Sequence, residues 1–201
     1  MTVKTILRYI YHIATSLNPR TIYWRCRLAE CGKNPSIGRH VSMFNPHFVV
    51  LGDNVVLNHH ISFHVNPIGK DALLKIGNGV QLGKYNDFGC SNKIIIEDKV
   101  ITAPFVHITD RDHSYNDINV PIMDQKPNSK GPVIIKEGCW LGFGVQIMSG
   151  VTIGKQSVIA AGSIITKDVP DYSIVAGNPA KVIKRYNPES HTWQKTNGNS
   201  I

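Results

Sequence analysis

The chain has 201 residues, of which 42% are hydrophobic and 18% charged, so it is long enough for one sizeable domain and its composition excludes general disorder. Lys and Arg number 22 against 14 Asp and Glu, and the formal charge of +8 favours an anionic partner such as nucleic acid, a membrane surface or a phosphorylated cofactor. No stretch approaches the roughly 18 apolar residues of a membrane span, and no secretory signal is evident, so we expect a soluble cytoplasmic protein with reduced cysteines.

The first segment, residues 2–30, combines apolar side chains at helical spacing with scattered basic ones. The apolar positions are Ile6, Ile10, Ile13 and Leu17. This pattern predicts a basic amphipathic helix. We expect residues 1–33 to cap the open end of the region that follows, and peripheral contact with the inner membrane surface is a second role that stays open.

A repeat of six residues dominates the rest of the chain. Apolar residues recur at every sixth position in three runs, which are Leu51, Leu57 and Phe63; Ile76, Leu82, Phe88, Ile94, Val100 and Val106; and Ile135, Leu141, Ile147, Ile153, Ile159 and Ile165. A Leu-Gly or Ile-Gly dipeptide accompanies many of the repeats. The phase slips between the runs, which indicates short insertions at turns.

A period of six fits neither a helix nor a plain alternating strand, but it fits short strands that are each interrupted by a turn. Three such strands would form one triangular coil, with the apolar residue of each hexamer inside and successive coils stacked through parallel hydrogen bonds. Turn segments such as 52–54 and 77–79 carry Gly, Asp and Asn, which tolerate positive φ. A β-sandwich would instead show period-two alternation with irregular spacing.

The hexamers stop between Ile108 and Ile135. The interruption begins with an Asp-Arg-Asp-His-Ser-Tyr sequence at 110–115 and continues as a stretch rich in Pro, Asn and Lys. Long irregular segments on a rigid scaffold are commonly functional. We therefore expect residues 109–132 to form an expelled loop that carries the chemistry.

The repeats and the segments at 160–170 and 175–184 resemble the hexapeptide-repeat acetyltransferase family, and the Asp-His-Ser-Tyr sequence at 112–115 resembles its bacterial polysaccharide and sugar O-acetyltransferases. The resemblance implies an all-β fold, a left-handed parallel β-helix solenoid with a short N-terminal helical cap and an expelled active-site loop. It divides the chain into a cap at 1–33, an acyltransferase domain at 34–185 and a C-terminal tail at 186–201. It also implies a homotrimer with active sites between subunits.

The same resemblance makes His113 the general base of an acetyl-CoA-dependent transfer to a sugar hydroxyl, in the synthesis of O-antigen, capsule or exopolysaccharide. An imidazole suits this step, because a sugar hydroxyl is a poor nucleophile at neutral pH. Asp110 and Asp112 are both candidates to orient His113, and the sequence does not separate them. Gly142 resembles the backbone donor to the oxyanion. No metal is expected.

Acceptor and coenzyme contacts follow from the same resemblance. The expected acceptor-binding residues are Asn86, Asp87, Tyr115 and Trp140. The expected coenzyme-binding residues are Trp140, Gly142, Ala161, Thr166, Lys167, Lys181 and Lys184. The lysines would meet phosphate groups, and the acceptor itself would be a small molecule or a glycan. Trp140 has an alternative role, which is to pack a corner of the coil.

Three other functions stay open at this point. His59, His64 and His107 could form a zinc site like that of gamma-type carbonic anhydrases. A streptogramin-type antibiotic acetyltransferase would keep the chemistry and change the acceptor. A β-helix without activity would leave the loop and the coenzyme motif unexplained. Nucleic acid is not expected as a partner, because the basic residues do not interleave with aromatic ones.

Overall fold

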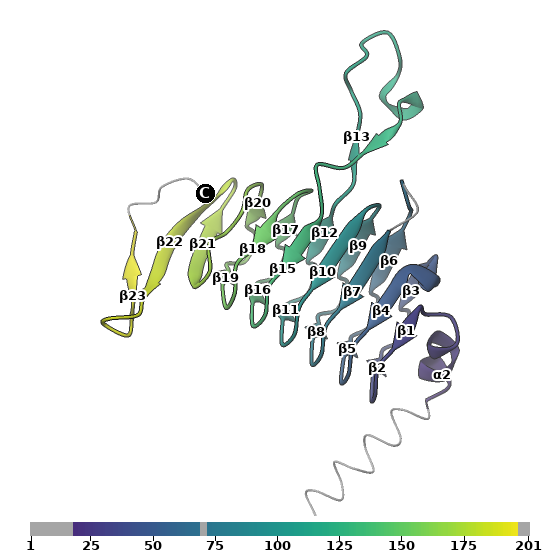
Figure 1. Ribbon diagram of the computed structural model, residues 1–201, viewed down its shortest axis with the longest axis horizontal. Helices are drawn as coiled ribbons and strands as arrows, with labels where there is room; N and C mark the ends of the chain where they lie inside the picture. Colours follow the sequence, from purple (N-terminus) through teal and green to yellow (C-terminus); the bar gives the residue numbers. More distant parts are fainter. Residues whose placement is uncertain (1–17, 69–71, 197–201) are drawn as a thin grey trace, which may run out of the picture.

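The computed structural model of the protein describes residues 18–68 and 72–196. Short strands of the coil visit three sheets in turn as far as the last coil, which is the arrangement of a three-sided parallel β-helix (Figure 1). The predicted coil of short strands is therefore confirmed, and a sandwich of antiparallel sheets is excluded. The predicted helix at Ile6, Ile10, Ile13 and Leu17 lies outside the described residues.

Each sheet is a stack of equivalent strands from successive coils, paired in parallel throughout the coil. The first sheet contains β1 (Glu30–Cys31), β4 (Val49–Leu51), β7 (Leu73–Ile76), β10 (Lys93–Ile96), β15 (Val133–Ile135) and β18 (Thr152–Ile153). The third sheet contains β3 (Ser42–Phe44), β6 (Ser62–Val65), β9 (Asp87–Cys90), β12 (His107–Thr109), β17 (Gln146–Ile147) and β20 (Ile164–Ile165).

The second sheet is the longest and continues past the last coil. Its parallel strands are β2 (Ser36–Ile37), β5 (Val56–Leu57), β8 (Gln81–Leu82), β11 (Ile101–Thr102), β16 (Trp140–Leu141), β19 (Val158–Ile159) and β21 (Ser173–Gly177). Two antiparallel strands, β22 (Ala180–Asn187) and β23 (Thr192–Lys195), then extend the sheet as a hairpin. Part of the segment expected to be a tail is thus paired into this sheet.

The core is a column of apolar side chains inside the coil. All fifteen residues of the three six-residue runs are buried, and each is at most 1% exposed. A column of this kind stabilises a coil only through its neighbours, because each short strand hydrogen-bonds to the coils before and after it. The six-residue period is therefore confirmed as the inward-facing register.

The Leu-Gly and Ile-Gly dipeptides mark places where successive coils approach closely. A Cβ on Gly142 would lie 2.7 Å from the backbone nitrogen of Ala161, and one on Gly77 would lie 2.8 Å from that of Asp98. Real Cβ atoms essentially never come so close to backbone. Turn residues play a different part, since Asn54 and Gly79 have positive φ as expected.

Helix α2 (Pro19–Arg25) lies at the first coil, where Asn18 caps it by accepting a hydrogen bond from the backbone N–H of Arg20. Trp24 of this helix packs against the core. The first strand of the coil begins at Glu30, before the expected boundary at residue 34. No helix among the described residues is long and apolar enough to cross a membrane.

Candidate active site

The segment between β12 and β15 leaves the three sheets and projects from the coil (Figure 1). It contains β13 (Asp112–His113), the short 3-10 helix η2 (Ile122–Asp124) and β14 (Pro127–Asn128). β13 and β14 pair antiparallel and place His113 opposite Pro127. The side chain of His113 is exposed, so its imidazole is accessible to a reactant.

Asp110 lies at the base of this loop and is fully buried. Its carboxylate accepts hydrogen bonds from the backbone N–H groups of Ser91 at 2.6 Å, Asn92 at 2.8 Å and Lys93 at 2.5 Å. These partners belong to the turn between β9 and β10 and to the first residue of β10, and not to the loop. Asp110 therefore anchors the loop to the coil, and the structure gives its carboxylate a role other than orienting His113.

Asp112 is also separated from His113, although the two are neighbours in sequence. Successive side chains of a strand point to opposite sides. The carboxylate of Asp112 lies 3.7 Å from the ammonium of Lys130. Tyr115 follows shortly after and is 70% exposed, so it is available for contact with an acceptor.

Asn86 is buried, and its side chain is hydrogen-bonded to residues of the next coil. Its amide nitrogen donates to the carbonyl of Ala103 at 2.9 Å, and its amide oxygen accepts from the hydroxyl of Thr102 at 2.5 Å. A residue that is 1% exposed and hydrogen-bonded in this way does not reach an acceptor. The expected acceptor contact at Asn86 is thus wrong, because at the corner before β9 this side chain is buried and bonds to the next coil.

Asp87, in contrast, points outward from the third sheet and has an imidazole on each side. Its carboxylate lies 3.0 Å from Nδ1 of His107 and 3.6 Å from Nε2 of His64. The side chains are 40–57% exposed, so the three form a polar cluster open to solvent on the same sheet from which the loop departs. We call His64, Asp87 and His107 the His–Asp–His cluster.

The expected zinc ligands do not come together. His59 lies at a corner, where its Nδ1 accepts a hydrogen bond from the backbone N–H of Arg39, whereas His64 and His107 belong to the outer side of the third sheet. Across residues 18–68 and 72–196, no group of three or more His, Cys, Asp or Glu side chains is arranged to hold a metal ion.

Trp140 lies on the outer side of the second sheet. It is 54% exposed and sits beside Ile101 of the neighbouring strand, which is 47% exposed. The alternative role, in which Trp140 packs a corner of the coil, is therefore wrong. An exposed indole on a rigid sheet offers a flat apolar wall to a ligand.

Gly142 cannot supply the expected free donor, because its backbone N–H already donates to the carbonyl of Ile159 at 2.8 Å. The glycine is required instead by the close approach of the next coil. The neighbouring residue Phe143 is 54% exposed, and its backbone N–H has no hydrogen-bond acceptor among the described residues.

The expected coenzyme residues fall into two groups on different corners. Trp140, Gly142 and Ala161 lie on the second sheet or at its corner with the third sheet, and Lys181 and Lys184 continue the second sheet on β22. Thr166 and Lys167 come directly after β20, at the end of the third sheet that faces away from this corner. The loop leaves the coil at the same end of the third sheet, after β12. Within one chain, Trp140, Gly142, Ala161, Lys181 and Lys184 thus lie along the second sheet and its corner. Thr166, Lys167 and His113 lie at the other end of the third sheet.

Sequence reasoning missed a column of stacked rings at the corner between the second and third sheets. The rings are those of His40, His60, Tyr85, Phe105 and Phe143, with successive centroids 4.7–5.3 Å apart. The first four residues have positive φ, which is unusual for bulky side chains. Aromatic residues recurring at coil-equivalent positions were the signal. We call these five residues the aromatic column.

Comparisons with known proteins agree with this architecture. Residues 132–167 match the family described as bacterial transferase hexapeptide (six repeats). Rv3034c of Mycobacterium tuberculosis, which carries an acetyltransferase name, is 34% identical over 70% of this chain and 52% of its own length. WbbJ of Escherichia coli, named for lipopolysaccharide-biosynthesis O-acetyl transfer, is 26% identical over 93% of both chains.

Among solved structures, the N-acyltransferase AntD from Bacillus cereus, in complex with dTDP and 3-hydroxybutyryl-CoA, superposes with a TM-score of 0.72. The match covers 88% of this chain and 93% of AntD at 19% identity, so it supports the fold alone. Residues 132–167 thus match the repeat of the bacterial hexapeptide transferases, and over longer alignments the chain is similar to proteins with acetyltransferase names. The chain spans about half the length of Rv3034c.

Proposed function

We propose that the chain is an acetyl-CoA-dependent O-acetyltransferase that acetylates a sugar hydroxyl during the synthesis of a surface polysaccharide, such as O-antigen, capsule or exopolysaccharide. The observation that carries the proposal is the position of His113, an exposed imidazole on a loop whose base is anchored by the buried carboxylate of Asp110. An anchored loop holds a base in place without a large entropic cost at each turnover.

In this proposal the imidazole of His113 removes the proton of the acceptor hydroxyl while that oxygen attacks the thioester carbonyl. A new C–O ester bond forms, the C–S bond breaks, and the imidazolium returns its proton to the departing thiolate. The developing oxyanion needs a nearby donor. The unpaired N–H of Phe143 replaces Gly142 in that role, since it lies one residue further along the same corner.

The proposed site is completed by a second copy of the chain. His113 and the edge formed by Trp140 and Ala161 lie on different corners of one coil, whereas reacting groups must approach within about 3.5 Å. A cyclic homotrimer would bring the loop of one copy to the second sheet of its neighbour. Thr166 and Lys167 of the copy that supplies the loop would then face the coenzyme bound on the second sheet of the other copy.

Exposed apolar side chains on both surfaces support this assembly. The far part of the loop carries Ile118 at 94% exposure and Met123 at 85%. The outer side of the second sheet and its corner offer Ile101, Trp140 and Phe143, each about half exposed. Large apolar side chains that are exposed together are common at protein contacts. We propose that the loop of one copy covers the corner of the next.

The acceptor would bind beside the loop, next to Tyr115 and the His–Asp–His cluster. Asp87 and its two imidazoles provide both hydrogen-bond donors and acceptors, which matches the alternating hydroxyl groups of a sugar. WbbJ, a relative over nearly the whole chain, has a name that places its chemistry in lipopolysaccharide synthesis. This likeness favours a glycan acceptor.

Three further expectations belong to the same proposal. The coil would wind left-handed, residues 1–33 would act as a cap with 34–185 as the transferase domain, and the protein would work in the cytoplasm with peripheral contact to the inner membrane. The packing of Trp24 against the core supports the capping role. The net charge of +8 would suit both the coenzyme phosphates and an anionic membrane surface.

The test is acetyl transfer from radiolabelled acetyl-CoA to a panel of bacterial sugars and glycan precursors, with His113→Ala as the control. We expect the variant to lose about 10²- to 10⁴-fold in kcat, because that is the usual contribution of a general base. Its melting temperature should match that of the parent, since the side chain is exposed. Turnover within about tenfold of the parent would contradict the role of His113.

A further inference from the structure

The hairpin β22–β23 continues the outer side of the second sheet beyond the last coil. Ile174 of β21 points outward between two buried neighbours, Ser173 and Val175, and it lies directly opposite Lys184. Lys184 in turn lies directly opposite Lys195. Directly opposed residues of an antiparallel pair share one side of the sheet. The outer side that carries Trp140 therefore ends in two adjacent lysines.

These two lysines form a like-charge pair, which is unfavourable when the charges face each other across a strand pair. No carboxylate of the described residues lies within 4.0 Å of either ammonium, whereas Lys130, Lys136 and Lys155 each have such a partner. Lys181, opposite the outward-facing Ala176, adds a third cation to the same side. The side is thus suited to an anion with more than one charge.

An aromatic pair lies beside the lysines on the same side of the hairpin. Tyr186 and Trp193 are directly opposite each other, and their ring centroids are 5.5 Å apart with the planes at 67°. Trp193 is 40% exposed. In an edge-to-face pair, one ring points its edge at the face of the other ring. Both faces of the first ring therefore stay free of contact with its partner. An uncovered ring face next to cations is how proteins commonly hold a nucleotide base and its phosphates.

We infer that Lys184, Lys195, Tyr186 and Trp193 form a subsite for the adenosine 3′-phosphate 5′-diphosphate end of the coenzyme. Phosphate oxygens would lie between the two ammonium groups, and the adenine would stack against the aromatic pair. This inference rests on the proposed function, because it assigns the nucleotide end of the same donor. It adds residues from β23, a strand that follows the coil.

The spacing of the strands agrees with the length of the coenzyme. β16, which carries Trp140, is separated from β22 by three steps across the sheet and from β23 by four. At about 4.8 Å per step these separations are roughly 14 and 19 Å. The chain of about 13 bonds between the sulfur and the diphosphate of coenzyme A extends roughly 16 Å, with bonds of about 1.5 Å in a zigzag. A thioester beside Trp140 therefore places its diphosphate near the lysines.

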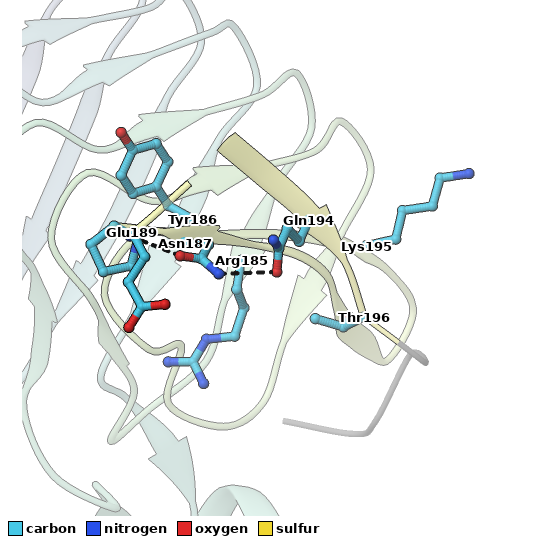
Figure 2. A pocket seen from close by; sticks show the side chains of 8 residues that line it. Arg185, Tyr186, Asn187, Glu189, Gln194, Lys195 and Thr196 are labelled. Atoms are coloured by element: carbon cyan, nitrogen blue, oxygen red, sulfur yellow. Dashed lines mark hydrogen bonds between the residues drawn. The ribbon is translucent and has the colours of Figure 1, made fainter. Parts of the chain in front are cut away.

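The opposite side of the hairpin is a less suitable site and provides a control. There an open pocket is lined by Arg185, Asn187, Gln194 and Thr196 together with Pro188 and Glu189. Tyr186 and Lys195 also border this pocket, and Figure 2 shows their side chains directed away from that of Arg185. The side-chain amides of Asn187 and Gln194 bond to each other at 3.4 Å. Figure 2 shows Arg185 directed to the side opposite Tyr186. Arg185→Gln thus removes one positive charge from the same hairpin without touching the proposed subsite.

The experiment is calorimetric titration of the full chain with coenzyme A and with adenosine 3′,5′-bisphosphate, for the parent, Lys195→Gln, Trp193→Ala and Arg185→Gln. We expect Lys195→Gln to weaken both ligands about fivefold, the upper range for an exposed ion pair. Trp193→Ala should weaken them at least fivefold, as loss of base stacking does. Arg185→Gln should bind like the parent, and pantetheine should bind all four proteins equally.

Several outcomes would overturn the inference. The first is equal binding of the ligands by the parent, Lys195→Gln and Trp193→Ala. The second is a loss of affinity confined to Arg185→Gln, which would move the site to the pocket of Figure 2. The third is a parent protein that binds neither ligand. Failure of the proposed function is a different result. In that case the parent would bind adenosine 3′,5′-bisphosphate in a Lys195-dependent way and yet acetylate no sugar.

Discussion

The carboxylate of Asp110 accepts a hydrogen bond from the backbone N–H of Ser91 at 2.6 Å, and this contact joins the base of the loop to the coil beneath it. The backbone carbonyl of Asp110 also accepts from the hydroxyl of Ser149 at 2.9 Å, in the coil above. One buried residue is therefore bonded to the coils on both sides. The direction in which the loop departs, and hence the position of His113, depends on it.

Asp110→Ala should lower the free energy of unfolding by about 3 kcal/mol, because it leaves three backbone N–H groups without their acceptor. Asp124→Ala, an exposed change in the same loop, should stay within about 0.5 kcal/mol of the parent. Urea unfolding at a fixed protein concentration measures both. Equal stability of the two variants would show that Asp110 does not anchor the loop.

Asn86 and Asp87 are neighbours in sequence, but the first is buried and the second is exposed to solvent. We therefore expect the alanine variant of Asn86 to lose stability and that of Asp87 to lose affinity for the acceptor. Asn86→Ala should lower stability by about 2 kcal/mol, since the hydroxyl of Thr102 loses its acceptor and the carbonyl of Ala103 loses the donor on Asn86. Asp87→Ala should keep the melting temperature and raise KM for the acceptor about fivefold or more. Thermal melts and steady-state kinetics separate the two effects. An Asn86→Ala protein with parental stability and a raised acceptor KM would contradict this assignment.

Two buried thiols should make stability depend on pH in the alkaline range. Burial raises the pKa of the Cys90 thiol to about 12, with the nearby Asp110 carboxylate contributing, and burial raises that of Cys139 to about 11. In the unfolded chain a thiol ionises near pH 8.5, so the unfolded state loses protons first as pH rises. The stabilisation is therefore complete below about pH 8.5 and is lost as pH rises from there toward 11 and 12.

The Cys90→Ala, Cys139→Ala double variant should reduce this alkaline loss, and the difference in slope from the parent isolates the two thiols. Urea unfolding at intervals between pH 8 and pH 10.5 provides the comparison. Each thiol contributes at most about 1.4 kcal/mol per pH unit. Parallel pH profiles for parent and variant would show that the thiols ionise equally in both states.

The interior of the coil could be predicted from the sequence because its register is repeated many times. Each of Leu82, Ile94 and Ile147 is one instance of the same inward position, so the pattern is visible without knowledge of the contacts. Turn positions such as Asn54 were equally readable, since positive φ selects particular residues. Local and periodic constraints thus gave the fold.

The outer surface was less predictable, because there the contacts join residues that are one coil apart. Asn86 and Asp87 have similar side chains, and only the corner geometry turns the first inward and the second toward His107. Gly142 matched a motif, but the sequence did not reveal that its N–H already bonds to Ile159. The pairing of Lys184 with Lys195 depends on a hairpin outside the repeat.

The most direct test of a shared active site is complementation between two inactive variants. His113→Ala removes the base, and Ala161→Trp obstructs the exposed corner expected to hold the coenzyme. If each site takes His113 from one copy and Ala161 from the next, unfolding and refolding the two variants together should restore about a quarter of the parental activity in a random cyclic assembly. Mixed assemblies, verified by native mass spectrometry, that stay as inactive as the separate variants would show that both residues act within one chain.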